Sequence, residues 1–468
     1  MGKQITRRTF IVGAGSILAL GYLSWERLVP GLLPGSGAAS QADGGAAATG
    51  GAAAGQAPPP PTVECDYIFR QGLISDGSGS KAQPGDVGVK GKEIVAIGDF
   101  QAAPGAVTID ARGLIICPGF IDPHTHTEDY LSRGGGAAMQ LLQGVTTHLG
   151  GNCGTSVDGV GAFLDGINKA GINLGLLAGY KNLRRAAVAK EGRAARPNEV
   201  AAMQEKLATM LQEGAFGLSV GLEYWPQTFA TTGELVDLCQ VLREKGGFYA
   251  THIRSESDRV LEAAAEAITI GQQAGVPVQY SHIKASFQRN WGKMQRILSL
   301  VDDARRGGLD ITADVYGYTF SSWDLGSSRD SLSEDDLQLA LQHPAVMIGS
   351  DSGLDAQGRA VHPRAYGNYP RILRRYALDK KVITLEQAIH KMTAMPAQRL
   401  GLKDRGLLAP GYKADIVAFD PEAIADRATR TNPNQTAAGV RWVLVNGQVA
   451  VKEGQVTGTM AGEVLRRN

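Results

Sequence analysis

The sequence predicts an α/β protein, a (β/α)8 TIM-like barrel with a small β-sandwich built from segments at both ends of the chain. Between residues 117 and 405, short apolar runs rich in β-branched and aromatic residues alternate with amphipathic helical patterns. Short strand-like runs broken by Gly, Pro and Asp flank this region on both sides. The 468 residues are 43% hydrophobic, which is ample for a large buried core.

The first 61 residues differ from the rest, and we exclude them from the fold. "TRRTF" at 6–10 precedes the apolar stretch "IVGAGSILALGYLSW" and the charged "ER", a pattern typical of a twin-arginine (Tat) export signal over residues 1–30. A short membrane anchor is the alternative, but the stretch contains glycines and is shorter than the ~20 apolar residues of a span. Residues 31–61 are rich in Ala, Gly and Pro and are expected to form a linker.

This signal predicts a protein exported to the periplasm by the Tat machinery. We expect no stable membrane span after export, although the chain would stay anchored if the signal were not cleaved.

Short strand-like runs separated by turn residues occur in both residues 62–116 and residues 406–468. "GDVGVKGKEIVAIG" lies in the first segment and "GVRWVLVNGQVAVKEG" in the second, where the "NG" at 446 and 447 indicates a hairpin. We expect the two segments to pair into one small β-sandwich domain, with the barrel over residues 117–405.

Eight strand candidates precede or separate the helical patterns of the barrel region. The helical stretches "NEVAAMQEKLATMLQEG" and "RVLEAAAEAITIGQQAG" both end at the glycine expected after a helix C-terminus. Alternation of this kind predicts parallel strands joined by helices. The candidates are "GFIDPHTH", "VTTHLGGN", "INLGLLAGY", "AFGLSVGLEY", "GFYATHIRS", "VPVQYSHIK", "DITADVYGY" and "AVMIGSDSG".

Charge and cysteine content argue against several classes of protein. Forty-seven basic and 46 acidic side chains leave a formal net charge of +1, and no basic run lies outside the extreme N-terminus, so we expect no nucleic-acid partner. Cys65, Cys117, Cys153 and Cys239 form no C-x-x-C pair, which argues against a disulfide scaffold and a zinc ribbon.

Polar side chains gather at the predicted C-terminal ends of the strands, where barrels carry their functional residues. The H-x-H of "DPHTH" places two imidazoles on one face of an extended strand, which is a weak metal signal by itself. Further histidines and an aspartate at equivalent points of later strands make a hydrolytic metal site the better interpretation. His148 lies mid-strand and is expected to be a core histidine. The strand-end residues are His124, His126, Cys153, Tyr224, His252, His282, Lys284 and Asp351.

Several of these motifs together resemble a known group. "PGFIDPHTH", "THIRSE", "SHIK" and "GSD" are similar to the amidohydrolase superfamily of metal-dependent barrels. "GNCG", "SVGLEY" and "HPRAYGNYPRIL" narrow the resemblance to the N-acyl-D-amino-acid deacylase (D-aminoacylase) family, over residues 63–468.

The resemblance implies zinc-dependent hydrolysis of the amide bond of N-acyl-D-amino acids, giving a carboxylate and a free D-amino acid. It implies that Cys153, His252 and His282 hold a tightly bound Zn²⁺. His124 and His126 would form a second, weaker metal position that shares the thiolate.

The resemblance also implies roles around the metal. Asp351 matches the family's catalytic acid/base, and one carboxylate can take a proton from water and later deliver it to the departing amine. Tyr224, Lys284 and Arg364 match the residues that bind the substrate carboxylate, a task suited to a guanidinium fork. The expected substrate is a small N-acyl amino acid or a short peptide.

Many amidohydrolases bridge two metals with a carboxylated strand-4 lysine. "GAFGLSVGLEYW" contains no lysine but offers Glu223, so Cys153 is the expected bridging anion. The segment between Tyr318 and Asp351 is shorter than in most family members. This predicts a more open entrance to the active site, which accepts bulkier acyl groups.

Two other functions remain open from the sequence. A peptidase or a cyclic-amide (hydantoinase-like) amidohydrolase would use the same attack on a C–N bond, and residue types do not reveal D or L preference. A non-catalytic binding module is a more distant alternative, because a fold can persist after its catalytic function is lost.

Overall fold

The computed structural model describes residues 60–128, 130, 137–188, 191–322, 325, 329–355, 357–360 and 362–467. The predicted export signal and residues 31–59 of the predicted linker lie outside these residues. No helix within the described ranges is both long enough and apolar enough to cross a membrane.

Parallel strands form the centre of the fold. One sheet has the order β11-β10-β8, and a second runs in chain order from β12 to β17. Only Leu177 separates β11 from β12, so the chain passes directly from one sheet to the other. The strands are β8 (Phe120–Asp122), β10 (Val145–Gly150), β11 (Asn173–Leu176), β12 (Ala178–Gly179), β13 (Gly217–Gly221), β14 (Phe248–His252), β15 (Val278–Tyr280), β16 (Ile311–Val315) and β17 (Val346–Ile348). Each coincides with a run that the sequence predicts to be a strand.

The register of these strands determines where polar side chains meet. Gly221 pairs with His252 at the end of β13 and β14, and Thr251 pairs with Tyr280 at the end of β15. Beyond β8 and β17, the short strand β9 (Thr125–His126) pairs in parallel with β18 (Ser352–Gly353). The carboxyl ends of the strands therefore share one edge, and the residues after them converge.

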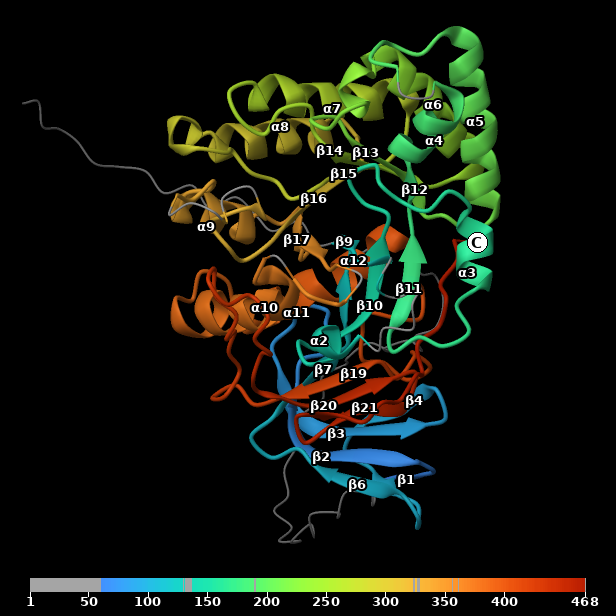
Figure 1. Cartoon of the computed structure of the whole chain (residues 1–468). Coiled ribbons are helices and arrows are strands. Elements are labelled where there is room, and N and C mark those ends of the chain that lie inside the picture. Colours follow the sequence, from blue (N-terminus) through green and yellow to red (C-terminus); the bar gives the residue numbers. More distant parts are fainter. Residues whose placement is uncertain are drawn as a thin grey trace, which may run out of the picture. The chain divides into compact units, whose positions relative to one another are not determined.

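Helices connect the strands, and Figure 1 shows α5 to α8 packed next to one another along the strands. Apolar residues of α7 recur at helical spacing on its buried face, at Val260, Ala263, Ala267, Ile270 and Ala274. The helix ends at Gly275 in the left-handed region, as the sequence predicts.

The helices and short helical turns have the following bounds: α2 (Ala138–Leu141), α3 (Val160–Asp165), α4 (Tyr180–Ala187), α5 (Pro197–Gln212), η1 (Gln227–Phe229), α6 (Thr232–Lys245), α7 (Val260–Ala274), η2 (Gln288–Asn290), α8 (Met294–Arg306), α9 (Glu334–Gln342), α10 (Arg364–Arg371), η4 (Ile372–Asp379), α11 (Leu385–Met392) and α12 (Ala394–Leu400).

Strands from both ends of the described chain share one further sheet. β7 pairs with β2 in parallel and with β19 in antiparallel orientation, so the blue and red strands lie together in Figure 1. The strands of this part are β1 (Thr62–Val63), β2 (Tyr67–Ile74), β3 (Gln83–Lys90), β4 (Glu93–Gly98), β5 (Gln101–Ala102), β6 (Val107–Asp110), β7 (Ile115–Pro118), β19 (Ile416–Phe419), β20 (Val440–Val445), β21 (Gln448–Lys452) and β22 (Gln455–Val456). β1 and β5 pair with each other, and the remaining nine strands form a single sheet.

A register shift interrupts the pairing of β2 in this sheet. Its first half pairs with β6 and its second half with β7, and the register shifts between Phe69 and Gly72. A Cβ atom at Gly72 would lie 2.4 Å from Cδ1 of Ile116, so any other residue would have to displace the Ile116 side chain. The sheet has its own apolar cluster, which includes Val87 and Ile416. Strands from both predicted segments therefore share one hydrogen-bonded sheet, and the β-sandwich stays a prediction.

His148 is a core residue, as expected. It lies in β10 and is 1% exposed, and its Nδ1 is 3.3 Å from the hydroxyl of Thr127. Its Nε2 has no hydrogen-bond partner among the described residues. Burial lowers the pKa of His148 to about 3, so the ring is neutral.

Candidate active site

The strand ends enclose a cavity of about 260 Å³. Eight of the nine site residues expected from the sequence line it, and the ninth, His124, is fully buried behind them. The lining residues are His126, Cys153, Thr155, Tyr224, His252, Glu256, His282, Lys284, Tyr316, Ser321, Ser322, Asp351 and Arg364.

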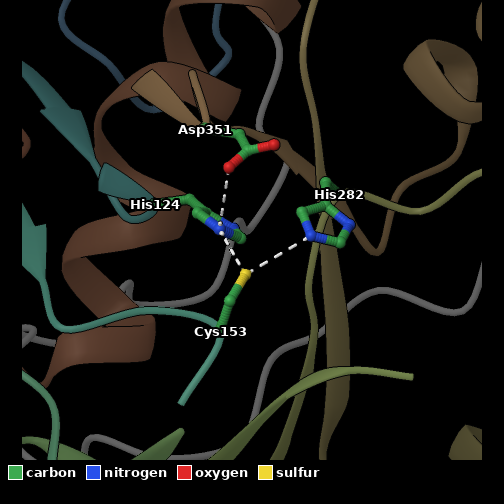
Figure 2. A group of neighbouring side chains, drawn as sticks. All are labelled: His124, Cys153, His282 and Asp351. Carbon is green, nitrogen blue, oxygen red and sulfur yellow. Dashed lines mark hydrogen bonds and ion pairs between the residues drawn. The ribbon is translucent and has the colours of Figure 1, made fainter. Parts of the chain in front are cut away.

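The thiol of Cys153 lies at the centre of the site (Figure 2). Its Sγ is 3.4 Å from Nε2 of His124 and 3.5 Å from Nε2 of His282. Oδ1 of Asp351 is 3.4 Å from the same nitrogen of His124. These four residues could hold one metal ion, because their ligand atoms all lie within 4.8 Å of one another.

His252 joins this group through His282. Nδ1 of His252 is 3.0 Å from Nε2 of His282, and the two rings meet edge to face. His252, His282 and Glu256 form a second group with ligand atoms within 4.8 Å of one another. The structure thus connects Cys153 to His252 through His282, and adds His124 to the thiol's direct contacts.

The second histidine of the H-x-H pair approaches from the neighbouring strand β9. Nε2 of His126 is 3.2 Å from Oδ1 of Asp351, and its ring lies 5.4 Å from that of His124. Both imidazoles of the pair therefore point at Asp351, although only His126 is partly exposed to solvent.

A carboxylate lies against the far nitrogen of each buried histidine. Asp314 is 3.0 Å from Nδ1 of His124, Glu223 is 3.2 Å from Nε2 of His252, and Glu256 is 2.8 Å from Nδ1 of His282. A carboxylate in this position accepts the ring N–H and directs the lone pair of the other nitrogen toward a metal.

The side chains present therefore fit zinc. The free nitrogens of His124, His252 and His282 all face the Cys153 region, and thiolate and imidazole are the ligands that zinc prefers.

Electrostatics favour the thiolate. Burial raises the pKa of Cys153, but the neighbouring His124 and His282 outweigh it and hold that pKa well below its usual range. Burial lowers the pKa of His252, but Glu256, Glu223 and Cys153 outweigh it and raise the pKa to about 10. A metal ion binding here would displace protons from these groups.

Three site residues have a strained backbone conformation. Among the described residues, nine other than glycine have positive φ, and three of them are Cys153 (φ 51°), His282 (φ 35°) and Asp351 (φ 51°). Such conformations cost on the order of 1–3 kcal/mol each and persist where the surrounding fold imposes them. Each of the three residues follows the end of a strand, so the strain aims its side chain into the cavity.

Asp351 forms a buried ion pair with Arg364. Nη2 of Arg364 is 2.8 Å from Oδ2 of Asp351 and 3.1 Å from the hydroxyl of Ser322. Burial raises the pKa of Asp351, but Arg364 and the nearby histidines hold it well below its usual range. The carboxylate is therefore ionised and able to accept a proton.

Lys284 and Tyr224 line the same cavity as Arg364. Lys284 is buried, and its Nζ lies 2.6 Å from Oε1 of Glu256. The ring of Tyr224 is 4.6 Å from that of His252. The three residues expected to bind a carboxylate thus share one cavity, with Lys284 already paired to an acid.

Sequence reasoning missed the supporting residues Asp314, Glu256 and Tyr316. Asp314 was visible as a charged residue inside the apolar strand "ITADV", and Glu256 as the acid four residues after His252. Tyr316 presents its ring to Arg364, whose Cζ is 4.7 Å from the ring centroid.

Comparison with known proteins agrees with these features. Residues 115–450 match the model of the amidohydrolase family. The chain is 34% identical over 475 residues to a D-aminoacylase of Alcaligenes xylosoxydans xylosoxydans, covering 86% of this chain and 98% of the relative.

Two solved structures are also similar. A crystal structure of D-aminoacylase matches with a TM-score of 0.80 and 31% identity, over 86% of this chain and all of the other. N-acyl-D-glutamate deacylase from Bordetella bronchiseptica, bound to zinc and a phosphonate mimic of the tetrahedral intermediate, matches with a TM-score of 0.79 and 31% identity, over the same shares. The matches imply a TIM-barrel fold with an additional domain. The chain belongs to the amidohydrolase family, within its N-acyl-D-amino-acid deacylase (D-aminoacylase) group.

Proposed function

We propose that this protein is a zinc-dependent hydrolase that cleaves the amide bond of N-acyl-D-amino acids, releasing a carboxylate and a free D-amino acid. The observation that carries the proposal is the set of Cys153, His252, His282 and Asp351 in one cavity with Arg364. Three relatives that this chain matches over nearly their whole length are named for this activity.

We assign the tight zinc position to Cys153, His252 and His282, and a second, weaker position to His124 and His126 with the shared thiolate. When bound, zinc supplies Lewis-acid polarisation of the amide and a water nucleophile at neutral pH.

Asp351 carries the proton through the reaction. Its carboxylate takes a proton from the attacking water as the new C–O bond forms, and it returns that proton to the nitrogen as the C–N bond breaks. Nη2 of Arg364, 2.8 Å from Oδ2, keeps the carboxylate ionised before the attack.

Arg364, Lys284 and Tyr224 orient the amino-acid end of the substrate. A guanidinium fork and an ammonium in a buried cavity bind a carboxylate through charge-assisted hydrogen bonds. Placing that carboxylate places the scissile amide next to Asp351, which is the positioning that hydrolysis needs.

We also propose that the parallel strands close into a complete (β/α)8 barrel over residues 117–405. The pairing of β9 with β18 supports closure, because these strands continue β8 and β17. The sheet that β7 shares with β19 supports a separate domain built from residues 62–116 and 406–468.

The Tat signal at residues 1–30 leads us to propose a periplasmic or otherwise exported protein. The twin-arginine route carries folded proteins, so zinc could enter before export. Cell fractionation tests this, and finding the mature chain only in the cytoplasm would contradict it.

One assay panel tests the function. Purified protein is offered N-acyl-D- and N-acyl-L-amino acids, a short peptide and a hydantoin, and the same sample is analysed for metal. We expect zinc and turnover of the D-acyl substrates. Turnover confined to the peptide or the hydantoin would identify the alternative amidohydrolases, and a zinc-free protein that cleaves nothing would indicate a binding module.

A further inference from the structure

Glu256 stands between the metal-ligand group and the carboxylate-binding group. It follows β14 by four residues and is 6% exposed. Its Oε1 is 2.8 Å from Nδ1 of His282 and 2.6 Å from Nζ of Lys284. One carboxylate oxygen thus contacts both a proposed zinc ligand and a proposed substrate-binding residue.

We propose that Glu256 is a positioning residue that couples zinc binding to recognition of the substrate carboxylate. The role of Glu256 in substrate recognition rests on the proposed function. Its role in zinc binding rests on the geometry of the ligands alone.

The first step concerns the tautomer of His282. Nζ of Lys284 also lies 3.0 Å from Nδ1 of His282. If the ammonium donated to Nδ1, the ring proton would sit on Nε2, which is the nitrogen that faces Cys153 and His252. Glu256 prevents this, because its carboxylate accepts the Nδ1 proton and leaves Nε2 free to bind a metal.

The second step concerns the ammonium of Lys284. Its three hydrogens have Oε1 of Glu256 at 2.6 Å and the carbonyl of His282 at 3.2 Å as acceptors, which leaves one hydrogen for the cavity. The contact with Glu256 therefore holds the Lys284 side chain in place, with one N–H left for a substrate carboxylate.

The third step explains why Glu256 is held in place. Oε1 of Glu223 accepts from the backbone N–H of Glu256 at 3.0 Å, while Oε2 of Glu223 is 3.2 Å from Nε2 of His252. The backbone N–H of Ser286 donates to the carbonyl of Glu256 at 2.6 Å. The loop after β14 is thus tied to the ends of both neighbouring strands.

Glu256→Gln tests the proposal with little change in volume. The amide oxygen can still accept a hydrogen bond but carries no charge, so it holds the Nδ1 proton of His282 less strongly than the carboxylate does. Zinc affinity is measured on the full chain by competition with a chromogenic chelator, and kcat and KM are measured at saturating zinc. We expect ~10–100-fold weaker zinc binding, as for loss of other outer carboxylates of metal-bound histidines, and a raised KM.

Lys284→Met is the matched variant for the substrate half. We expect it to raise KM while zinc affinity stays within about threefold of wild type, because Glu256 still accepts from His282. Glu256→Asp keeps the charge and should recover part of the zinc affinity lost in Glu256→Gln. If Glu256→Gln did not fold, Glu256→Asp would carry the test, with zinc affinity below wild type expected.

Wild-type zinc affinity in Glu256→Gln, or in Glu256→Asp where only that variant folds, would overturn the proposal. A loss of zinc in Lys284→Met equal to that in Glu256→Gln would overturn it as well. The proposed function is tested separately: it fails if the zinc-loaded wild-type protein cleaves no N-acyl amino acid. The zinc measurements are independent of that outcome, because they are made without substrate.

Discussion

Replacing Asp351 by asparagine removes the proposed acid/base group and leaves the shape of the site unchanged. General acid–base catalysis contributes ~10²–10⁴-fold to a rate. Because one carboxylate serves both proton transfers, we expect the upper end, a ~10⁴-fold loss of kcat that corresponds to about 5 kcal/mol in the barrier.

The structure also bounds the effect on stability. Breaking a buried ion pair by removing one partner costs ~3–5 kcal/mol. Arg364 keeps its hydrogen bond to Ser322 and its contact with the ring of Tyr316, and the asparagine oxygen can still accept from it. We therefore expect a loss of ~1–3 kcal/mol in the free energy of unfolding.

The assay is kcat with saturating N-acetyl-D-methionine, together with zinc content and chemical unfolding of the same sample. Zinc should remain at the proposed tight site, because Cys153, His252 and His282 are unchanged. Asp426→Asn is the matched control, since Asp426 pairs with Arg371 at 2.9 Å and does not line the cavity. A folded, zinc-loaded Asp351→Asn enzyme with kcat within tenfold of wild type would refute the assigned role.

Four further predictions concern a metal ligand, a substrate-binding residue, a glycine of β2 and a buried lysine. Cys153→Ala should lose tightly bound zinc, and full zinc by metal analysis would contradict the ligand assignment. Arg364→Lys should raise KM at least ~10-fold, because an ammonium cannot replace the guanidinium fork; an unchanged KM would place the substrate carboxylate elsewhere. Gly72→Ala should lower the free energy of unfolding by ~1–3 kcal/mol through its clash with Ile116, and an unchanged denaturation midpoint would contradict the packing. Burial lowers the pKa of Lys391 to about 8, so between pH 8 and about 10.5 this lysine takes up a proton on unfolding. The free energy of unfolding of wild type should therefore rise relative to that of Lys391→Met as pH increases through this range. A difference that does not change with pH would contradict this.

The strand ends illustrate how much of the site could be read from local pattern. His252 and His282 follow apolar runs that are strands in the structure, and barrel geometry brings the ends of such strands together. The expectation that Cys153 meets these histidines needed only the order of the strands and the resemblance of the motifs.

The supporting contacts could not be read in the same way. Asp314 meets His124 across 190 residues of sequence, and Glu256 meets Lys284 across 28. A carboxylate in a sequence looks the same whether it faces solvent or a histidine, so its partner is decided only when several strands are in register. The division of β2 between two partners belongs to the same class, because it depends on β6 and β7 pairing in succession along one strand edge.

By itself, then, the sequence determined the alternating elements, the family and the residue types available for chemistry, because these depend on local periodicity and short motifs. Tertiary structure alone decided that Arg364 pairs with Asp351, that Lys284 is already engaged by Glu256, and which nitrogen of each histidine is free. Those features depend on distances of a few ångströms between residues remote in the chain, and packing of the whole barrel sets such distances.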